Sequence, residues 1–475
     1  MSVPTANTAG AWKPIERFIF RVACLFFVTM SVPLSWSYYE RLFTLNWLSL
    51  NYRDITNMGR FSPSLITIPT ESGRWGLASY ADWGVILLAA LVGALLWSLF
   101  DKRKEYRKLY YWLRVVVRYR VAVGMIEFGF VKVFLVQMPF PPISTLHTHF
   151  GDITAQKLYW LSVGIVPTYE IFLGFVEVIA GFLLFFRKTA TIGAFLTACA
   201  SANIVYINHA YDGGVHVYSA YFVLLCLFLL WQDIPRIGKL LIREQDVVPV
   251  SYYPAFAGLW AKCLRYGVKA GLIFLFVVLL SVLHWRNLHH DRYVKLPATP
   301  GLPGAAGYYQ VTEFRHNGEL LPYSPFDSVR WQDAIFEEHS TLTFKVNEPI
   351  QISLSNGVPR IGDVLRDWEL AGTAGGRHFY YYDADTVNQV LRLENKHIPA
   401  GRESRGGGNR SRGKDRANQQ PRSEFVLHYD RPDRSRIVLD GVTEKADSIH
   451  VVLDKVERRY PLDDLTIYQR AKKTW

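Results

Sequence analysis

Cysteine is scarce in this chain of 475 residues, and its scarcity excludes several kinds of chemistry at once. The four cysteines lie in or beside apolar runs, none follows residue 286, and none forms a C-x-x-C pair: Cys24, Cys199, Cys226 and Cys263. A disulfide framework, a zinc site of familiar spacing and thiol redox chemistry are therefore not expected. The sequence also lacks a glycine-rich phosphate loop, a serine nucleophile elbow and a dinucleotide fingerprint, which leaves soluble-type catalysis without visible residues.

Long apolar runs dominate the first 286 residues. Half of all residues are hydrophobic and 15% are aromatic, while the charged residues gather in blocks. Seven runs approach the roughly 20 residues that a helix needs to cross about 30 Å of hydrocarbon. These runs cover residues 18–36, 83–100, 113–136, 160–186, 189–209, 215–231 and 267–285. The sequence therefore predicts an α-helical polytopic membrane bundle of about seven transmembrane helices.

The distribution of lysine and arginine predicts the orientation of these spans. With a cytoplasmic N-terminus, the inside segments hold 17 basic residues, whereas the outside loops before the last span hold five: Arg41, Arg53, Arg60, Arg74 and Lys157. The positive-inside rule then places the region after residue 286 outside. The first run has no small-residue cleavage site and is expected to remain as a helix. We expect a bacterial inner membrane protein whose net charge of +12 reflects topology and contact with the lipid bilayer, not nucleic acid.

Short runs of alternating apolar and polar residues follow the last span. They begin at Gly307 and predict about ten strands of an antiparallel sandwich or barrel. The runs are GYYQVTEF, DAIFEE, TLTFKV, PIQISLS, FYYYDAD, QVLRLE, EFVLHYD, RIVLDG, SIHVVLDKVE and LTIYQ. A segment rich in glycine and arginine at residues 400–424 has no apolar content and is predicted to be a disordered insert. The exterior β domain is expected to span residues 287–475.

Four ionisable residues lie inside the apolar runs: Glu127, Lys132, Glu170 and Glu177. A charge at the centre of a membrane helix costs about 2.5 to 3.5 kcal/mol, so such residues persist when they are paired or functional. If the fourth helix starts after Pro167, a rise of 1.5 Å per residue puts Glu127 and Glu177 about 13 Å below the outer surface. By the same rise Lys132 lies about 6 Å deep and Glu170 lies near the outer end.

Helical spacing adds glycines and a second polar group. Gly174 and Gly181 share a stripe with Glu170 and Glu177, which predicts close helix approach beside the carboxylates. Arg118 and Arg120 lie near the cytoplasmic end and are expected to snorkel. The fifth run and the start of the sixth add further candidates at the same outer level, namely Asn203, Asn208, His209, Asp212 and His216. We predict one polar cluster that opens toward the exterior domain.

This cluster has two interpretations. Lys132 could pair with Glu177 or Glu127 and so lock the helices together, or the group could bind a ligand or a proton. One lysine for three carboxylates leaves a surplus of negative charge, which favours function slightly. Metal sites at His147-x-His149 with Asp152, at His289-His290-Asp291, or through haem at His209 or His216 lack a complete ligand set, so none is predicted.

The stretches RYRVAVGMIEFGFVKVF and YEIFLGFVEVIAGFLLFFRKTATIGA resemble the DoxX-like family of four-helix membrane proteins. Gly-x-x-Lys, with Gly129 and Lys132, precedes a helix that carries glutamate and glycine before a basic turn. The resemblance covers about residues 113–232 and implies a four-helix bundle, with Lys132 and Glu177 in the family's positions. It also implies an association with quinone-linked oxidoreductases. Residues 1–112 would add two helices with an exterior loop, and residues 233–286 a cytoplasmic loop and a seventh helix.

Three hypotheses of function follow. The first is a membrane redox component that binds a quinone or another lipophile at Glu127, Lys132 and Glu177. The second is a membrane-anchored binding or assembly protein whose exterior β domain recognises a protein partner, with the polar cluster acting only as a staple. The third, motivated by the surplus of glutamate, is a proton-coupled transporter of a small solute, although no inverted repeat or pair of interrupted half-helices is evident.

Overall fold

The structure is a computed structural model that describes residues 12–63, 65–66, 80–247, 252, 254, 258–357, 359–397 and 422–464. The chain divides into two compact units. The helical unit comprises the chain up to Phe134 together with Phe172–Arg286. The barrel unit comprises Leu135–Ile171 together with the described residues from Asn287 onward. Each unit is described by itself.

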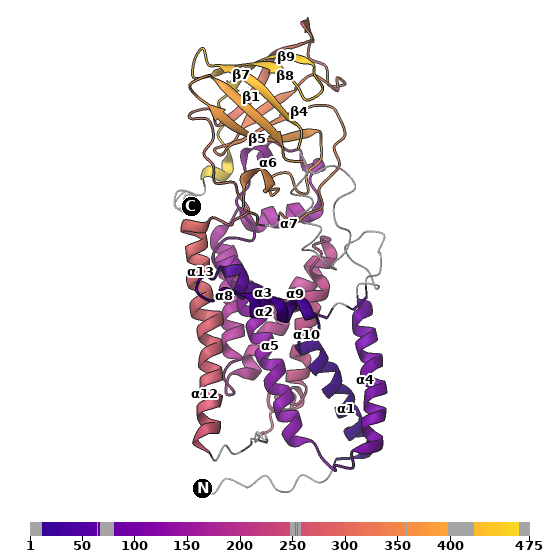
Figure 1. Cartoon of the computed structure of the whole chain (residues 1–475). Coiled ribbons are helices and arrows are strands. Elements are labelled where there is room, and N and C mark those ends of the chain that lie inside the picture. Colours follow the sequence, from indigo (N-terminus) through magenta and orange to yellow (C-terminus); the bar gives the residue numbers. More distant parts are fainter. Residues whose placement is uncertain are drawn as a thin grey trace. The chain divides into compact units, whose positions relative to one another are not determined.

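Helices cover most of each of the seven apolar runs (Figure 1). Short helices lie between several of them, and the stretch after α12 continues through a π-helical segment, η3, into α13. α1 packs against α4 and α5, and α10 packs against α9 and α5. The helices are α1 (Pro14–Ser31), α2 (Trp36–Thr44), α3 (Tyr52–Gly59), α4 (Ala81–Phe100), α5 (Arg107–Val133), α8 (Pro167–Leu183), α9 (Ala190–Ala210), α10 (His216–Leu230), α11 (Ile234–Leu241), α12 (Leu259–Ile273), η3 (Phe274–Leu279) and α13 (Leu280–Arg286).

Several of these helices could span a membrane. Three are long and apolar enough to do so, namely α4, α9 and the stretch Leu259–Asp291. The number rises to six if each pair of helices that is bent by more than 40° at a short break counts as one span. These pairs are α1 with α2, α7 (Ala155–Gly164) with α8, and α10 with α11. α5 is not among them, because its 27 residues include charged side chains along most of its length.

The fourth apolar run, predicted as residues 160–186, is not one helix. It is interrupted at Ile165 and Val166, and α8 begins at Pro167, as the sequence predicted. Proline suits the first turn of a helix because its missing N–H would have no partner there. α7, which precedes the break, belongs to the barrel unit together with α6 (Ile143–Leu146) and η2 (Phe150–Asp152).

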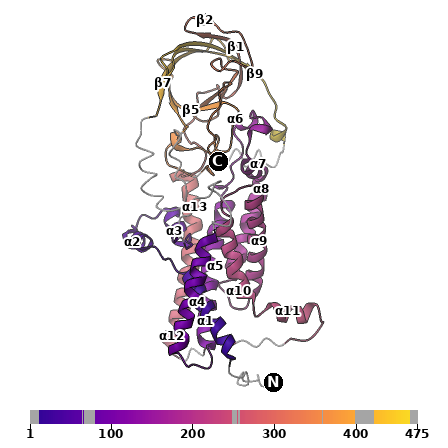
Figure 2. The ribbon, with the colours of Figure 1, turned by 90° about the vertical axis from the view of Figure 1, so that its right-hand side faces the viewer.

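The barrel unit contains a closed antiparallel barrel of eight strands (Figure 2). Neighbours along the chain pair with each other, and pairing of β1 with β9 closes the sheet. The short strand β2 extends the β1 hairpin. The strands are β1 (Gly307–His316), β2 (Glu319–Leu320), β3 (Asp333–Phe336), β4 (Thr341–Lys345), β5 (Arg377–Asp385), β6 (Val390–Asn395), β7 (Glu424–Asp430), β8 (Arg436–Val442) and β9 (Ser448–Val456).

Large side chains fill the barrel interior. β7 alternates exposed and buried residues along its whole length, which is the pattern that predicted a strand. Its inward residues join a core in which the rings of Trp331 and Phe344 stack with centroids 3.8 Å apart. Tyr309, Tyr380 and Tyr382 belong to the same core. The interior is therefore a packed core, as is usual for a small barrel, and pairing of β1 with β9 closes the eight main strands.

Eight of the ten predicted strands are present. Of the two predicted architectures, sandwich and barrel, the structure shows the barrel. The prediction for PIQISLS was wrong, because residues 349–355 form no strand. They lie instead in a loop whose backbone is held from elsewhere: Gly372 donates to the carbonyl of Ser353, and Lys295 donates to that of Asn356. The run LTIYQ and the predicted disordered insert up to residue 421 lie outside the described residues.

Candidate functional site

Glycines bring α5 and α8 into close contact in the helical unit. A Cβ atom on Gly129 would lie 2.7 Å from the carbonyl oxygen of Gly174, and one on Gly181 would lie 2.9 Å from that of Ala122. Such distances leave no room for any side chain, so these backbones touch. This contact confirms the close approach that the glycine stripe on α8 predicted. It also fixes the rotation of each helix and thereby the direction in which its polar residues point.

Lys132 and Glu177 face each other across this contact. The ammonium nitrogen lies 2.9 Å from Oε1 and 2.8 Å from Oε2 of the carboxylate, and both side chains are buried. The sequence left open whether Lys132 pairs with Glu177 or with Glu127, and the structure selects Glu177. Because each group satisfies the other, the pair behaves as an internal ion pair between α5 and α8.

Glu127 has a different partner, Arg60, which follows α3. The distance from Arg60 Nε to Glu127 Oε1 is 2.8 Å, and the carboxylate is fully buried. An Asn51–Asp54 capping box starts α3 and helps to set the position of its far end, where Arg60 lies. In sequence Arg60 was only one of the outside basic residues, so nothing in helical periodicity could have identified this pairing.

Arg120 is the main departure from the sequence prediction. It was expected to snorkel, but its side chain is 5% exposed and points into the helical unit. Nη2 donates to the carbonyl oxygen of Phe61 at 2.5 Å and to the hydroxyl of Tyr218 at 3.0 Å. The guanidinium also lies 4.1 Å from the ring centroid of Phe61. Gly124 makes the space, because a Cβ there would lie 2.8 Å from Nη1.

The helical unit therefore has a cationic centre instead of the predicted surplus of acid. Arg60, Arg120 and Lys132 face the carboxylates of Glu127 and Glu177. Arginine stays protonated in proteins, so Arg120 keeps its charge although it is buried. Nε and Nη1 of Arg120 have no hydrogen-bond partner among the described residues. We call Arg60, Arg120, Glu127, Phe61 and Tyr218 the arginine centre.

The candidates on α9 and at the start of α10 form a separate group. Tyr80 OH lies 3.1 Å from His209 Nε2, and the rings of His209 and His216 lie 4.6 Å apart. Asn208 has a structural role, because its side chain accepts from Val215 N and donates to the carbonyl of Ile204. Asp212 adopts φ 52° in the same turn, and Asn203 is exposed on α9. The structure thus divides the predicted cluster.

Glu170 makes its contacts in the barrel unit. Oε1 accepts from the backbone N–H of Met138 at 3.1 Å, and the carboxylate acts electrostatically on Lys295. The contacts of Glu177 all lie in the helical unit, although both residues belong to α8. The two carboxylates therefore do not share a set of partners. Lys295 follows the last apolar run and gave no signal in the sequence.

The remaining histidine candidates do not converge. His147 stacks on Tyr308 with ring centroids 4.0 Å apart, whereas His149 lies 3.5 Å from Asp152. His289 and His290 lie in the short π-helix η4 (Asn287–Asp291). In the described part of the chain, no group of three or more histidine, cysteine, aspartate and glutamate side chains is arranged to hold a metal ion.

Comparisons with known proteins cover only a small part of the chain. No family model matches the sequence, and no solved structure matches it. A stretch of 93 residues is 36% identical to the protein named "Uncharacterized protein YwoB" of Bacillus subtilis (strain 168). This stretch is 18% of the present chain and 60% of the relative, so the chain spans less than two thirds of that protein. The similarity is local, and the relative's name states no activity.

Proposed function

We propose that the chain is an integral protein of a bacterial inner membrane with seven spans, a cytoplasmic N-terminus and an exterior barrel. The excess of basic residues in the segments assigned to the inside supports this orientation. The spans would be α1, α4, α5, α8, α9, α10 and the stretch Leu259–Asp291. α5 is included because Glu127 and Lys132 are paired and Arg120 donates inside the unit. We further propose that the four helices α5, α8, α9 and α10 within residues 113–232 form a DoxX-like core, in keeping with the Gly129–Gly174 contact and the Lys132–Glu177 pair.

Within this core we propose that the arginine centre binds the polar head of a lipophilic molecule, with quinones as the preferred class. The observation that carries the proposal is the buried guanidinium of Arg120, whose Nε and Nη1 lack partners among the described residues. A buried donor without a partner costs about 1 to 3 kcal/mol, and more when the group is charged. A carbonyl or carboxylate oxygen of a ligand would remove that cost.

The surroundings of Arg120 suit a planar, oxygen-bearing ring. Its guanidinium lies 5.2 Å from the ring centroid of Tyr221 and 5.3 Å from that of Phe222. Aromatic faces offer stacking and exclude water, which strengthens a hydrogen bond from the cation to a carbonyl oxygen. Glu127 and the hydroxyl of Tyr218 lie in the same centre and could exchange a proton with the bound head group. The role proposed is binding within a membrane redox system.

The test is mild-detergent purification followed by an absorption spectrum and mass spectrometry of extracted small molecules. We expect a quinone or another lipophile with a carbonyl or carboxylate head, other than a phospholipid, at near-stoichiometric amounts. Arg120→Met should reduce its content at least tenfold, since a hydrogen bond to a charged group contributes about 1.5 to 3 kcal/mol. Arg118→Met, two residues away on α5, serves as the matched control. Recovery of phospholipid alone, or equal ligand content in Arg120→Met, would contradict the proposal.

A second candidate function is a membrane-anchored binding or assembly protein. It is favoured by the closed geometry of Lys132 and Glu177, in which both carboxylate oxygens already have a partner. If this pair is only a staple, the variant with Lys132→Met and Glu177→Gln should keep both its fold and its exterior protein partner. Loss of the partner from a folded variant would refute this candidate. The transporter hypothesis loses its motivation, because Glu127 and Glu177 each face a cation.

A further inference from the structure

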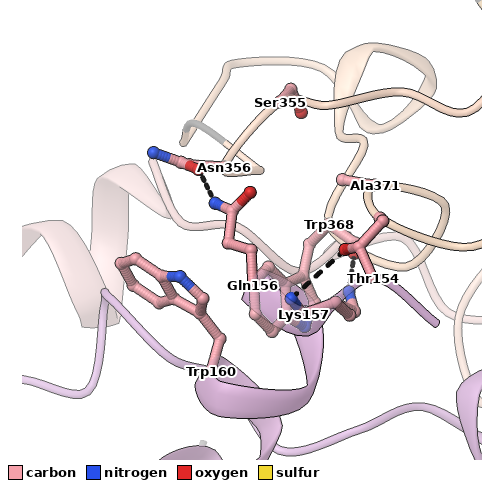
Figure 3. Close-up of a pocket in the computed structure, with 9 residues that line it drawn as sticks. Thr154, Gln156, Lys157, Trp160, Ser355, Asn356, Trp368 and Ala371 are labelled. Atoms are coloured by element: carbon pink, nitrogen blue, oxygen red, sulfur yellow. Dashed lines mark hydrogen bonds between the residues drawn. The ribbon is translucent and has the colours of Figure 1, made fainter. Parts of the chain in front are cut away.

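The barrel unit contains a solvent-open cleft at the start of α7 (Figure 3). Thr154, Gln156, Lys157 and Trp160 contribute one wall from α7 and the residue before it. The opposite wall comes from Ser355, Asn356 and the segment Trp368–Gly372. The cleft encloses about 210 Å³ when its open mouth is counted. Much of that space is open solvent, so the cleft admits only the end of a small group through its mouth and cannot hold a lipid chain or a nucleotide.

Two buried lysines lie on the same aromatic ring in this region. The ammonium of Lys157 lies 3.7 Å from the ring centroid of Trp368, and that of Lys295 lies 4.7 Å from it. Their exposed fractions are 3% and 5%. Lys157 donates to the carbonyl oxygen of Trp368, and Lys295 donates to the carbonyl oxygens of Gln137 and Asn356. Among the described residues neither ammonium has a carboxylate oxygen within 4.0 Å.

The acidic side chains near these lysines have other hydrogen-bond or ion-pair partners. Asp367 accepts from the hydroxyl of Ser355 and lies 4.0 Å from Arg360. Glu369 forms a fully buried ion pair with Lys396. Glu170 is the third carboxylate that acts on the pair, through Lys295. When Lys157 and Lys295 are protonated, no carboxylate pairs with either ammonium among the described residues, so the cleft is electropositive.

One of the residues that line the cleft has a hydrogen-bond donor without a partner among the described residues. The indole N–H of Trp368, which is 2% exposed, has no hydrogen-bond partner in the described part of the chain. The positive end of the α7 dipole adds to the same field, because Gln156 and Lys157 lie in the first turn of that helix. Donors and positive charge together select an oxygen-rich anion over a cation or a neutral apolar group.

We propose that this cleft binds a small oxyanion, a carboxylate or a phosphate group, on the indole N–H of Trp368 and the ammonium of Lys157, with Lys295 completing the positive field. The bound group is either a free anion or the head group of an anionic lipid. This site is independent of the arginine centre, because all of its residues belong to the barrel unit.

The site has a definite dependence on pH. Burial, the main cause, lowers the pKa of both Lys157 and Lys295 from 10.5 to about 7. The charge of Lys295 lowers the pKa of Lys157 further, while Glu369 and Asp367 raise it. Glu170 and Asp367 raise the pKa of Lys295. An anion binds the protonated lysines, so its affinity is highest below pH 7. Above pH 7 it should fall about tenfold per pH unit for each lysine that must take up a proton.

The test uses the full chain in nanodiscs of zwitterionic lipid, with inorganic phosphate and acetate as probes in calorimetry at constant ionic strength. We expect saturable binding at pH 6 that weakens strongly by pH 8.5. Trp368→Phe keeps the ring under both ammoniums and removes only the N–H, so it should weaken binding about fivefold to tenfold, as expected for one hydrogen bond. Lys295→Met should weaken it further, whereas Lys345→Met on β4 should not change it.

A second arm distinguishes the source of the anion. Nanodiscs that contain phosphatidic acid are compared with those of zwitterionic lipid alone. If a lipid head group fills the cleft, phosphatidic acid should abolish the calorimetric signal of inorganic phosphate in the parent protein. If the site takes a free anion, the signal should persist. Absence of phosphate and acetate binding at pH 6, or binding that Trp368→Phe and Lys295→Met leave unchanged, overturns the proposal. Since Arg120 is intact in every variant, the lipophile content reports separately on the arginine centre.

Discussion

The ion pair of Lys132 and Glu177 gives the sharpest test of how the helical unit is held together. Replacing one partner, as in Glu177→Gln or Lys132→Met, leaves the other group buried. At 2.8 Å and an effective dielectric constant near 20, the gross attraction between the charges is roughly 6 kcal/mol. Part of this is offset by desolvation, and removal of one partner from a buried pair typically costs about 3 to 5 kcal/mol.

The double variant should recover most of that loss. With both charges removed, no uncompensated ion stays between α5 and α8, and the glycine contact is intact. We expect the double variant to lie within about 1 kcal/mol of the parent. With single variants that each cost about 3 kcal/mol or more, the coupling energy is then about 5 kcal/mol. Polar contacts between membrane helices average only about 0.6 kcal/mol, so such a value would identify a true ion pair.

The measurement is a double-mutant cycle on reversible unfolding in mixed micelles. The pair Arg114 and Asp233 is the matched control in the same unit, because its atoms are 3.3 Å apart and its side chains are 25% and 16% exposed. Removing both members of that pair should show a coupling of about 0.2 to 1 kcal/mol. Single variants of Lys132 and Glu177 that cost less than about 1 kcal/mol would refute the reasoning, as would a double variant whose cost equals the sum of the two.

Three further predictions concern other parts of the chain. Gly129→Val should destabilise the helical unit by about 3 kcal/mol or more, because the added Cβ would collide with the backbone of α8. Gly271→Val is the control: a Cβ there has no atom of the described residues within 4 Å, so the melting temperature should stay almost unchanged. Glu369→Gln strands the buried ammonium of Lys396 and should cost the barrel unit about 3 kcal/mol in a denaturant titration. Burial lowers the pKa of His147 from 6.5 to about 4. Between these pH values the unfolded chain binds a proton at His147 more readily than the folded chain, so the free energy of unfolding decreases as the pH falls from 6.5 toward 4. His147→Phe should make the melting temperature of the barrel unit fall less between pH 7 and pH 5, and an unchanged pH dependence would contradict this assignment.

Local patterns in the sequence predicted most of the helices and strands. Continuous apolar runs predicted the long helices, because side chains on every face of such a segment avoid water. Alternation with a period of two predicted eight strands, since β7 and its neighbours bury every second residue. The glycine spacing on α8 predicted close helix contact, because i, i+4 and i+7 positions share one face. PIQISLS shows the limit of such patterns: it alternates like a strand, but the loop that contains it is fixed by contacts with distant segments.

Only the tertiary structure decided which charges meet. The position of a residue along a helix can be read from the sequence, but the rotation of the helix about its axis and the position of the loops cannot. Rotation and loop position decide that Glu177 pairs with Lys132 and that Glu127 pairs with Arg60. The same holds for Arg120, whose long side chain could reach either way along α5 until Gly124 and the carbonyl of Phe61 gave it a place inside. Lys157 and Lys295 are 138 positions apart and meet on one indole ring. Charge pairing acts over a few ångströms in space, and sequence spacing measures that distance only within a single helix or strand.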